Sequence, residues 1–298
     1  MIAEKFSERG IIPVGTVAVT IGIDTQADGF IWVLSCWGRR MELWLPLTGE
    51  LVGDLRGDDV WQELADVLGM TWLDRDGNAY RSTVSAMDVQ GDNYSSCLEF
   101  VRTNGFRLKL KAVRGWAPAR GVGARSIGIL RNAYQDPTTR VVIQNIDVDA
   151  AKSWFANLLA KKDPIAVHLP RGENGEDVGG WTCETIAELT AEYRKQTNLR
   201  GYVITRWHKR AGRANHRLDA VIYSMAALQM SRLKIDSCEL QRTEAKNLGK
   251  PVQKAGEAKP SPFGARPIKV LPDLSNWQGY TWRPPGGSPY GATGGGIF

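Results

Sequence analysis

The sequence predicts an α/β domain built on a mixed β-sheet with helices on its faces. The first part of the chain is a run of strand-like segments, and the middle part alternates helical and strand-like segments, which is the pattern that produces such a sheet. Hydrophobic residues make up 43% of the 298 residues and charged residues 23%, which is ordinary for a globular protein. A chain of this length can bury a sizeable core.

Three consecutive strands are expected to open the sheet. Residues 17–24 are rich in β-branched side chains, and the Asp28-Gly29 pair that follows favours a tight turn because both residue types tolerate positive φ. Residues 30–37 and 41–47 are two further apolar segments. We therefore expect an antiparallel meander with Asp24 at the end of its leading strand.

Helices and strands alternate in the next part of the chain. The expected helices cover residues 58–68, 94–103, 149–159, 182–196 and 216–233, with Asp149 capping the third, and the expected strands cover 83–87, 106–112, 140–144, 165–169 and 202–207. The glycine-rich segments 114–126 and 171–180 have no hydrophobic period and are expected to be loops. We assign residues 1–14 to an N-terminal linker, 15–235 to one domain, and 236–298 to a flexible, extended tail rich in proline and glycine.

Hydropathy and cysteine spacing exclude several classes of protein. No apolar stretch reaches the ~20 residues that a membrane-spanning helix needs. The four cysteines are widely separated and form no C-x-x-C pair, so they fit neither a disulfide framework nor a zinc site. We expect reduced thiols in a cytosolic compartment and no contact with a membrane.

Two stretches without acidic residues carry clustered positive charge. The first runs from residue 100 to 135, and the second precedes Asp219. The side chains selected as candidate DNA contacts are Lys109, Lys111, Arg114 and Arg120 in the first stretch and Lys209, Arg210 and Arg213 in the second. Positive surface beside carboxylates is typical of enzymes that act on a phosphate backbone. Either stretch alone is equally consistent with a solvated face.

Three aspartates lie where predicted elements begin or end. Asp24 and Asp88 each end an apolar strand, and Asp219 lies in the first turn of the last helix. Carboxylates placed in this way can converge at one edge of a sheet, where two Mg²⁺ or Mn²⁺ ions about 4 Å apart can promote phosphodiester cleavage. Each position also has a structural explanation, which is a turn for Asp24, a helix cap for Asp88 and the helix macrodipole for Asp219.

Six short motifs follow one another between residues 21 and 233. They are Gly22-Ile23-Asp24-Thr25-Gln26, Glu42-Leu43-Trp44-Leu45, Met87-Asp88-Val89-Gln90-Gly91, Ala166-Val167-His168-Leu169-Pro170, Leu189-Thr190-Ala191-Glu192 and Asn215-His216-Arg217-Leu218-Asp219. Together and in this order they resemble the nuclease domain of lambda-type phage terminase large subunits. Gln90 stands where that family usually has glycine, and His216 stands where it usually has glutamate.

The resemblance implies an RNase H-like fold and an Mg²⁺- or Mn²⁺-dependent endodeoxyribonuclease that cuts concatemeric phage DNA. It implies that Asp24, Asp88 and Asp219 are the catalytic carboxylates that bind the metal ions, and that Lys152 contacts phosphate. His168 is expected to be a hydrogen-bonded structural residue.

The resemblance also implies partners and a location. The partners are double-stranded DNA, an ATPase domain, a small terminase subunit and a portal protein reached through the C-terminal tail. The location is the host cytoplasm, and transiently the procapsid portal. The sequence lacks a G-x-x-x-x-G-K-[ST] motif, since residues 121–126 have no lysine at the required place, and we expect no ATP hydrolysis by this chain.

Two other functions remain open from the residues. A non-catalytic module that clamps DNA or docks on the portal would keep the basic surface and the tail but would need no metal. Another RNase H-like nuclease, such as a resolvase or transposase, would use the same carboxylates. The order of the motifs favours the packaging nuclease.

Overall fold

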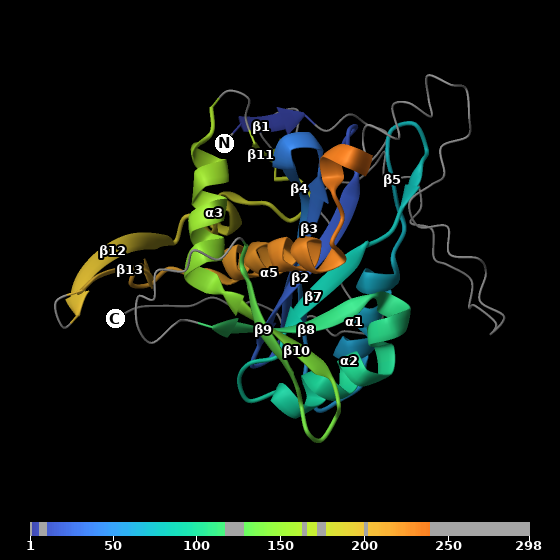
Figure 1. Cartoon of the computed structure of the whole chain (residues 1–298). Helices are drawn as coiled ribbons and strands as arrows, with labels where there is room; N and C mark the ends of the chain where they lie inside the picture. The colour runs from blue at the N-terminus through green and yellow to red at the C-terminus, as the bar shows by residue number, and fades with distance from the viewer. Residues whose placement is uncertain are drawn as a thin grey trace, which may run out of the picture.

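A nine-stranded mixed sheet forms the centre of the structure (Figure 1), a computed structural model that describes residues 2–5, 11–116, 128–162, 166–171, 177–199 and 202–238. The strand order is β1-β11-β4-β3-β2-β7-β8-β10-β9. These strands are β1 (Ile2–Lys5), β2 (Ala18–Gln26), β3 (Gly29–Trp37), β4 (Leu43–Val52), β7 (Val84–Asp88), β8 (Leu110–Trp116), β9 (Leu130–Gln135), β10 (Val142–Asp147) and β11 (Val167–Arg171).

Two small ribbons and several helices complete the described part of the chain. The ribbons pair β5 (Trp72–Leu73) with β6 (Ala79–Tyr80) and β12 (Glu192–Leu199) with β13 (Tyr202–Lys209). The helices are the 3-10 turn η1 (Arg39–Met41), α1 (Asp59–Gly69), α2 (Tyr94–Leu108), α3 (Val148–Ala160), α4 (Cys183–Glu188) and α5 (His216–Ser231). In this part of the molecule, no helix has the length and apolar character needed to cross a membrane.

The sheet changes direction at β2. β2, β3 and β4 pair antiparallel, as the meander prediction requires, whereas β2, β7, β8 and β10 pair parallel. The order β4-β3-β2-β7-β8 is the RNase H-like arrangement, and the predicted fold class is confirmed. Parallel strands end at a common edge, so the carboxyl ends of β2, β7 and β8 lie together.

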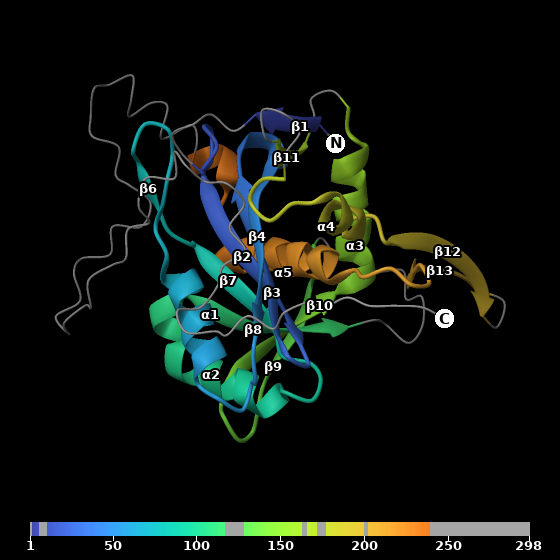
Figure 2. The ribbon, with the colours of Figure 1, turned by 180° about the vertical axis from the view of Figure 1, so that it is seen from behind.

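Helices cover both faces of the sheet because the inner strands are apolar on both sides (Figures 1 and 2). On β2, Val19, Ile21 and Ile23 belong to the buried cluster that contains the apolar side chains of α1 and α2. The alternate residues face α5, and Thr20 Oγ1 donates a hydrogen bond of 3.1 Å to the Ser224 carbonyl of that helix. α5 is therefore buried along most of its length.

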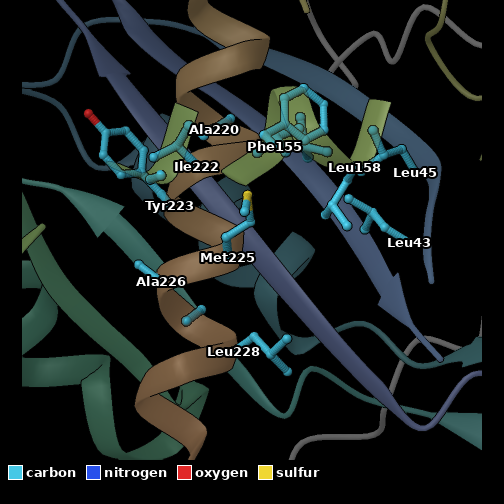
Figure 3. Close-up of a cluster of buried hydrophobic side chains, with 14 of the residues drawn as sticks. Leu43, Leu45, Phe155, Leu158, Ala220, Ile222, Tyr223, Met225, Ala226 and Leu228 are labelled. Carbon is cyan, nitrogen blue, oxygen red and sulfur yellow. The ribbon is translucent and has the colours of Figure 1, made fainter. Parts of the chain in front are cut away.

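A second buried cluster joins α5 to α3 and β4. Figure 3 shows Phe155 and Leu158 of α3 together with Leu43 and Leu45 of β4, beside the apolar residues of α5. The neighbouring residues Cys36 and Trp37 of β3 follow the alternation of a strand and are fully buried on opposite faces of the sheet. This packing fixes the start of α5 over the edge at which β2 and β7 end.

Four of the predicted secondary-structure features were wrong in type or position. The helix predicted over 182–196 ends at Glu188, and its second half is the strand β12. The strand predicted over 106–112 begins only at Leu110, because residues 106–108 form the last turn of α2. The edge strand β9 lies where no strand was predicted, and Asp147 caps α3 in place of Asp149 by accepting the Ala150 N–H at 2.9 Å.

The termini were assigned to a linker and a tail. β1 lies within the predicted linker and pairs parallel with β11 at one edge of the sheet. Residues 235–238 form a helical turn after α5, and residues 239–298, which make up most of the predicted tail, lie outside the described residues.

Candidate active site

Asp24 and Asp88 lie side by side at the carboxyl edge of the sheet. In the pairing of β2 with β7, Ile23 is opposite Met87, and each aspartate is the next residue. The Thr25 hydroxyl donates a hydrogen bond of 2.6 Å to the Asp88 carbonyl and so ties the two strand ends together. Both aspartates are buried, at 6% and 7% exposure. The structure thus brings together the two strand-end carboxylates that the sequence singled out.

Asp219 reaches the same place from the first turn of α5. The helix can approach β2 because Gly22 has no side chain: a Cβ at Gly22 would lie 1.8 Å from the Ala220 carbonyl oxygen and 2.5 Å from the Ser224 nitrogen. This backbone contact between β2 and α5 thus sets the distance between Asp24 on the strand and Asp219 on the helix. Glycine is required here by close approach, not by its φ angle.

Buried Arg217 fixes the start of α5 from the other side. Its guanidinium nitrogens lie 2.6 Å from a carboxylate oxygen of Glu188 on α4 and 2.6 Å from one of Glu50 on β4. Its backbone N–H also donates to Glu188 at 2.9 Å, which satisfies one of the free N–H groups at the helix terminus. Breaking a buried ion pair by removing one partner is strongly destabilising, so this arrangement holds Asp219 in place.

Protein donors engage the carboxylate of Asp24. The Gln26 side-chain amide donates to Oδ2 at 2.5 Å, and the His216 Nδ1 atom lies 3.1 Å from the same oxygen. His216 occupies the position before Arg217 at the start of α5, so it reaches across from the helix to the end of β2. The hydrogen bond with Asp24 raises the pKa of His216.

Two neutral donors engage the carboxylate of Asp88. The Gln90 backbone N–H donates to Oδ1 at 3.3 Å, and the hydroxyl of buried Tyr223 on α5 hydrogen-bonds the carboxylate. Figure 3 shows Tyr223 on the same helix as the buried apolar residues. Asp88 is thus the least neutralised of the three aspartates.

The three carboxylates lie close enough for their charges to interact. Burial, together with the charges of Asp24 and Asp219, raises the pKa of Asp88 to about 7. Burial raises the pKa of Asp219 to about 6 despite the nearby ammonium of Lys152. Burial also raises the pKa of Asp24. Negative charges that repel one another in a buried pocket are the condition that a divalent cation relieves.

The donor set fits Mg²⁺ or Mn²⁺, although protein donors already engage the three carboxylates. Hard carboxylate oxygens from several elements are the ligands that these ions prefer. In the described ranges, no three His, Cys, Asp or Glu side chains are placed so that together they hold a metal ion. Protein donors engage Asp24 and both oxygens of Asp219.

The candidate DNA contacts do not all lie near the carboxylates. Arg114 is exposed and follows Val113, the partner of Asp88, so it lies at the carboxyl edge of β8. Lys109 precedes β8 and Lys111 is its second residue, toward the opposite edge. Lys209 is exposed at the end of β13, Arg210 and Arg213 are exposed between β13 and α5, and Arg120 lies outside the described residues.

Lys152 and His168 are both buried. The Lys152 ammonium lies 2.5 Å from Glu192 and 2.9 Å from Asp219, so it contacts two carboxylates and is not an exposed helix lysine. His168 stacks on Trp44 with ring centroids 5.4 Å apart and pairs with Glu42 at 2.9 Å, as expected of a structural residue.

Sequence reasoning did not assign roles to several residues of the pocket. These are Gln26, Glu188, Glu192, Asn215, Arg217 and Tyr223. The signal that the sequence offered was that five of them fall within or directly beside the quoted motifs. It gave no reason to bring Glu192 and Lys152 together, because they are 40 residues apart.

An RNase H-like sheet, with carboxylates at the ends of two neighbouring strands and at the start of the last helix, is the arrangement of the RNase H-like nucleases. The chain belongs to the family described as terminase large subunit gpA, endonuclease domain, whose model matches residues 2–241. The large subunit of the terminase from Escherichia phage lambda is 25% identical over 240 residues, which cover 77% of this chain and 35% of that protein. The chain thus spans about a third of that relative's length.

Solved structures of the large terminase from a thermophilic bacteriophage are also similar. One, in crystal form 3, has a TM-score of 0.40 at 11% identity and covers 74% of this chain and 42% of that chain. Another, in crystal form 2, has a TM-score of 0.35 at 12% identity over 74% and 41%.

Proposed function

We propose that this chain is a metal-dependent endodeoxyribonuclease that cuts concatemeric phage DNA during packaging by two-metal phosphodiester hydrolysis. Membership of the terminase endonuclease family supports the reaction class. The observation that carries the proposal is that the carboxylates of Asp24, Asp88 and Asp219 interact electrostatically at one edge of the sheet, where Asp24 and Asp88 are buried and the side chain of Asp219 is 20% exposed. These three carboxylates would hold Mg²⁺ or Mn²⁺, which when bound offsets charge on the phosphate and lowers the pKa of an attacking water.

The pocket's own residues prepare it for this reaction. Gly22 and Arg217 set the position of α5, and therefore of Asp219, relative to Asp24. Tyr223 directs a hydroxyl at Asp88 from inside the core and orients that carboxylate. His216 engages Asp24 from the rim, where it is 34% exposed in its side chain and able to move when a cation or phosphate enters.

The β12–β13 ribbon supplies a surface for the DNA backbone. It extends away from the sheet (Figures 1 and 2). Opposite residues of an antiparallel pair share a face. One face carries Tyr193 opposite His208, and Lys195 opposite Arg206. Lys195 and Arg206 thus place two cationic side chains on one face, which suits contact with an anionic backbone.

The aromatic residues of this face lie beside its positive charges. The guanidinium of Arg210 lies 5.2 Å from the centroid of the Tyr193 ring, whose own centroid is 6.1 Å from that of His208. The other face is anchored to α3, since the Trp207 indole N–H donates to the Ser153 hydroxyl at 3.0 Å. We assign the first face to phosphate contacts, and the wider assembly with an ATPase domain, a small subunit and a portal protein is part of the same proposal.

Plasmid nicking in the presence of Mn²⁺ tests the proposal. We expect Asp24→Asn, Asp88→Asn and Asp219→Asn each to abolish nicking while the fold, measured by circular dichroism, is retained. Asp76→Asn, an exposed aspartate with 64% of its side chain accessible, is the matched control and is expected to cut normally. Undiminished cutting by the three pocket variants would refute the assignment.

A second candidate function is a DNA-clamping module that does not use metal. The observation in its favour is that, in the described part of the chain, no three His, Cys, Asp or Glu side chains are grouped closely enough to hold an ion. Electron paramagnetic resonance of Mn²⁺ separates the two functions. Loss of the free-ion signal at stoichiometric protein supports the nuclease, and an unchanged signal at millimolar Mn²⁺ supports the clamp.

A further inference from the structure

Four buried or half-buried side chains form a closed ring beside the carboxylate pocket. The Lys152 ammonium lies 2.5 Å from Glu192 Oε1 and 2.9 Å from Asp219 Oδ1. The Asn215 side-chain amide donates to the same Glu192 oxygen at 2.7 Å and to Asp219 Oδ2 at 2.8 Å. One cation and one amide therefore each bridge the same two carboxylates.

This ring leaves Asp219 with both oxygens engaged. A divalent cation that binds Asp219 competes with Lys152 and Asn215 for these oxygens. Lys152 is 7% exposed, so little bulk water can solvate its ammonium when it leaves Asp219. An unpaired ammonium in such a place is costly, and it also repels an incoming cation.

Glu192 is the carboxylate to which Lys152 can turn without leaving the ring. Its side chain is 5% exposed, it already accepts from both Lys152 and Asn215, and it is the nearer of the two partners of Lys152. It stands at the first position of β12, and the backbone around it is fixed by the pairing of Glu192 with Lys209. It can therefore hold Lys152 while Asp219 moves.

We propose that Glu192 is a positioning residue that takes over Lys152 and Asn215 when Asp219 turns to a divalent cation. The proposal rests on the proposed function, because it presumes a cation in the carboxylate pocket. It concerns the exchange of partners within the ring. Glu192 itself does not contact the substrate or the reacting atoms.

The affinity for Mn²⁺ alone, measured by isothermal titration calorimetry on the full chain, tests this role directly. Glu192→Gln leaves Lys152 with Asp219 as its one carboxylate partner in the ring, so we expect Mn²⁺ affinity to fall about tenfold, within the range of coupling measured for neighbouring charged groups. In a Lys152→Met background the competitor is gone, and the same substitution should change the affinity by less than about threefold. If Glu192 acts through its charge alone, Glu192→Gln will lower the Mn²⁺ affinity equally with Lys152 present and with Lys152→Met. That result would overturn the proposal.

A second variant keeps the test independent of the folding of Glu192→Gln. Glu192→Asp retains the charge but withdraws it by one methylene from Lys152. We expect weaker Mn²⁺ binding, whereas a role limited to charge would leave binding unchanged. Glu184→Gln, in the exposed first turn of α4, is the matched control for the loss of one negative charge and should bind Mn²⁺ normally.

Mn²⁺ binding by the unsubstituted chain distinguishes a failure of the proposed metal-dependent function from a failure of the role proposed for Glu192. Failure of that chain to bind Mn²⁺ would overturn the metal-dependent function and this proposal together. Mn²⁺ binding by that chain, with equal effects of Glu192→Gln in the presence and absence of Lys152, would overturn only the role of Glu192.

Discussion

Gly22→Ala is expected to damage the active site without removing any of its polar residues. The methyl group would meet the backbone of α5 at 1.8 Å from the Ala220 oxygen, and it would also lie 2.5 Å from the Ser224 nitrogen. Separations below 3.0 Å are not found for real Cβ atoms, so the strand and helix must separate by at least the difference between 3.0 and 1.8, which is 1.2 Å. Neither contact is with a flexible side chain that can turn away.

The expected loss of cutting rate is large because β2 and α5 separate close to the catalytic carboxylates. Asp24 is two residues from Gly22 on β2, and Asp219 directly precedes Ala220 on α5, so their spacing changes with the helix. A displacement of about 1 Å in catalytic geometry can reduce a rate about 100-fold. Overpacking a well-packed core typically costs about 1–3 kcal/mol of stability. We therefore expect a folded but less stable protein with severely reduced cutting.

Two assays measure these effects separately. Urea unfolding gives the change in the free energy of unfolding, and Mn²⁺-dependent nicking of plasmid gives the change in rate. Gly69→Ala is the control, because a Cβ at Gly69 meets nothing within 4 Å, and it should leave both quantities nearly unchanged. A Gly22→Ala protein as stable and as active as the parent would contradict the reasoning that backbone contact between β2 and α5 sets the site.

Two further predictions concern pH and DNA binding. The raised pKa values of Asp88, to about 7, and Asp219, to about 6, mean that the folded state holds protons more tightly than the unfolded state. Without metal, the free energy of unfolding should therefore fall as pH rises from about 4 to about 7, by up to about 1.4 kcal/mol per pH unit for each group, and Asp88→Asn should flatten that slope in urea titrations. Charge reversal at Lys195 and Arg206 should weaken duplex binding and reduce its salt dependence in fluorescence anisotropy. Reversal at Lys109, placed before β8 and away from the carboxyl edge, is the control, and an equal loss there would count against the assignment of the ribbon face.

The central part of the fold could be predicted because its signals are local. The strands β2 and β3 are apolar and β-branched, and the Asp28-Gly29 turn between them is explicit in the sequence. The positions of Asp24 and Asp88 at strand ends then follow from the hydrophobic pattern alone.

The errors fall where tertiary contacts override local preference. Ile186, Leu189 and Tyr193 have helical spacing, which favoured one helix over 182–196, but only the first two pack on the core and Tyr193 lies on an exposed ribbon. β9 is a polar edge strand, and its pairing with β10 has no counterpart in the hydrophobic pattern. Phe106 is apolar but fully exposed at the end of α2, and the strand predicted to begin there begins instead at Leu110.

The sequence predicted that Asp24 and Asp88 end neighbouring strands and that Asp219 lies at the start of the last helix, but it did not predict the partners of these carboxylates. Asp24, Asp88 and Asp219 were identified from their places in elements and from the motifs. The ring of Lys152 with Glu192 and Asn215 could not be, because its members come from α3, from the start of β12 and from the N-terminal cap of α5, and only the folded chain brings these together.

The positions of bound Mn²⁺ in a crystal of this protein, located by anomalous diffraction after soaking, test the central claim most directly. We expect anomalous peaks bounded by the carboxylates of Asp24, Asp88 and Asp219, with Asp219 released from Lys152. A crystal in which Mn²⁺ is absent from that pocket, with Asp219 still paired to Lys152 at saturating metal, would contradict the account.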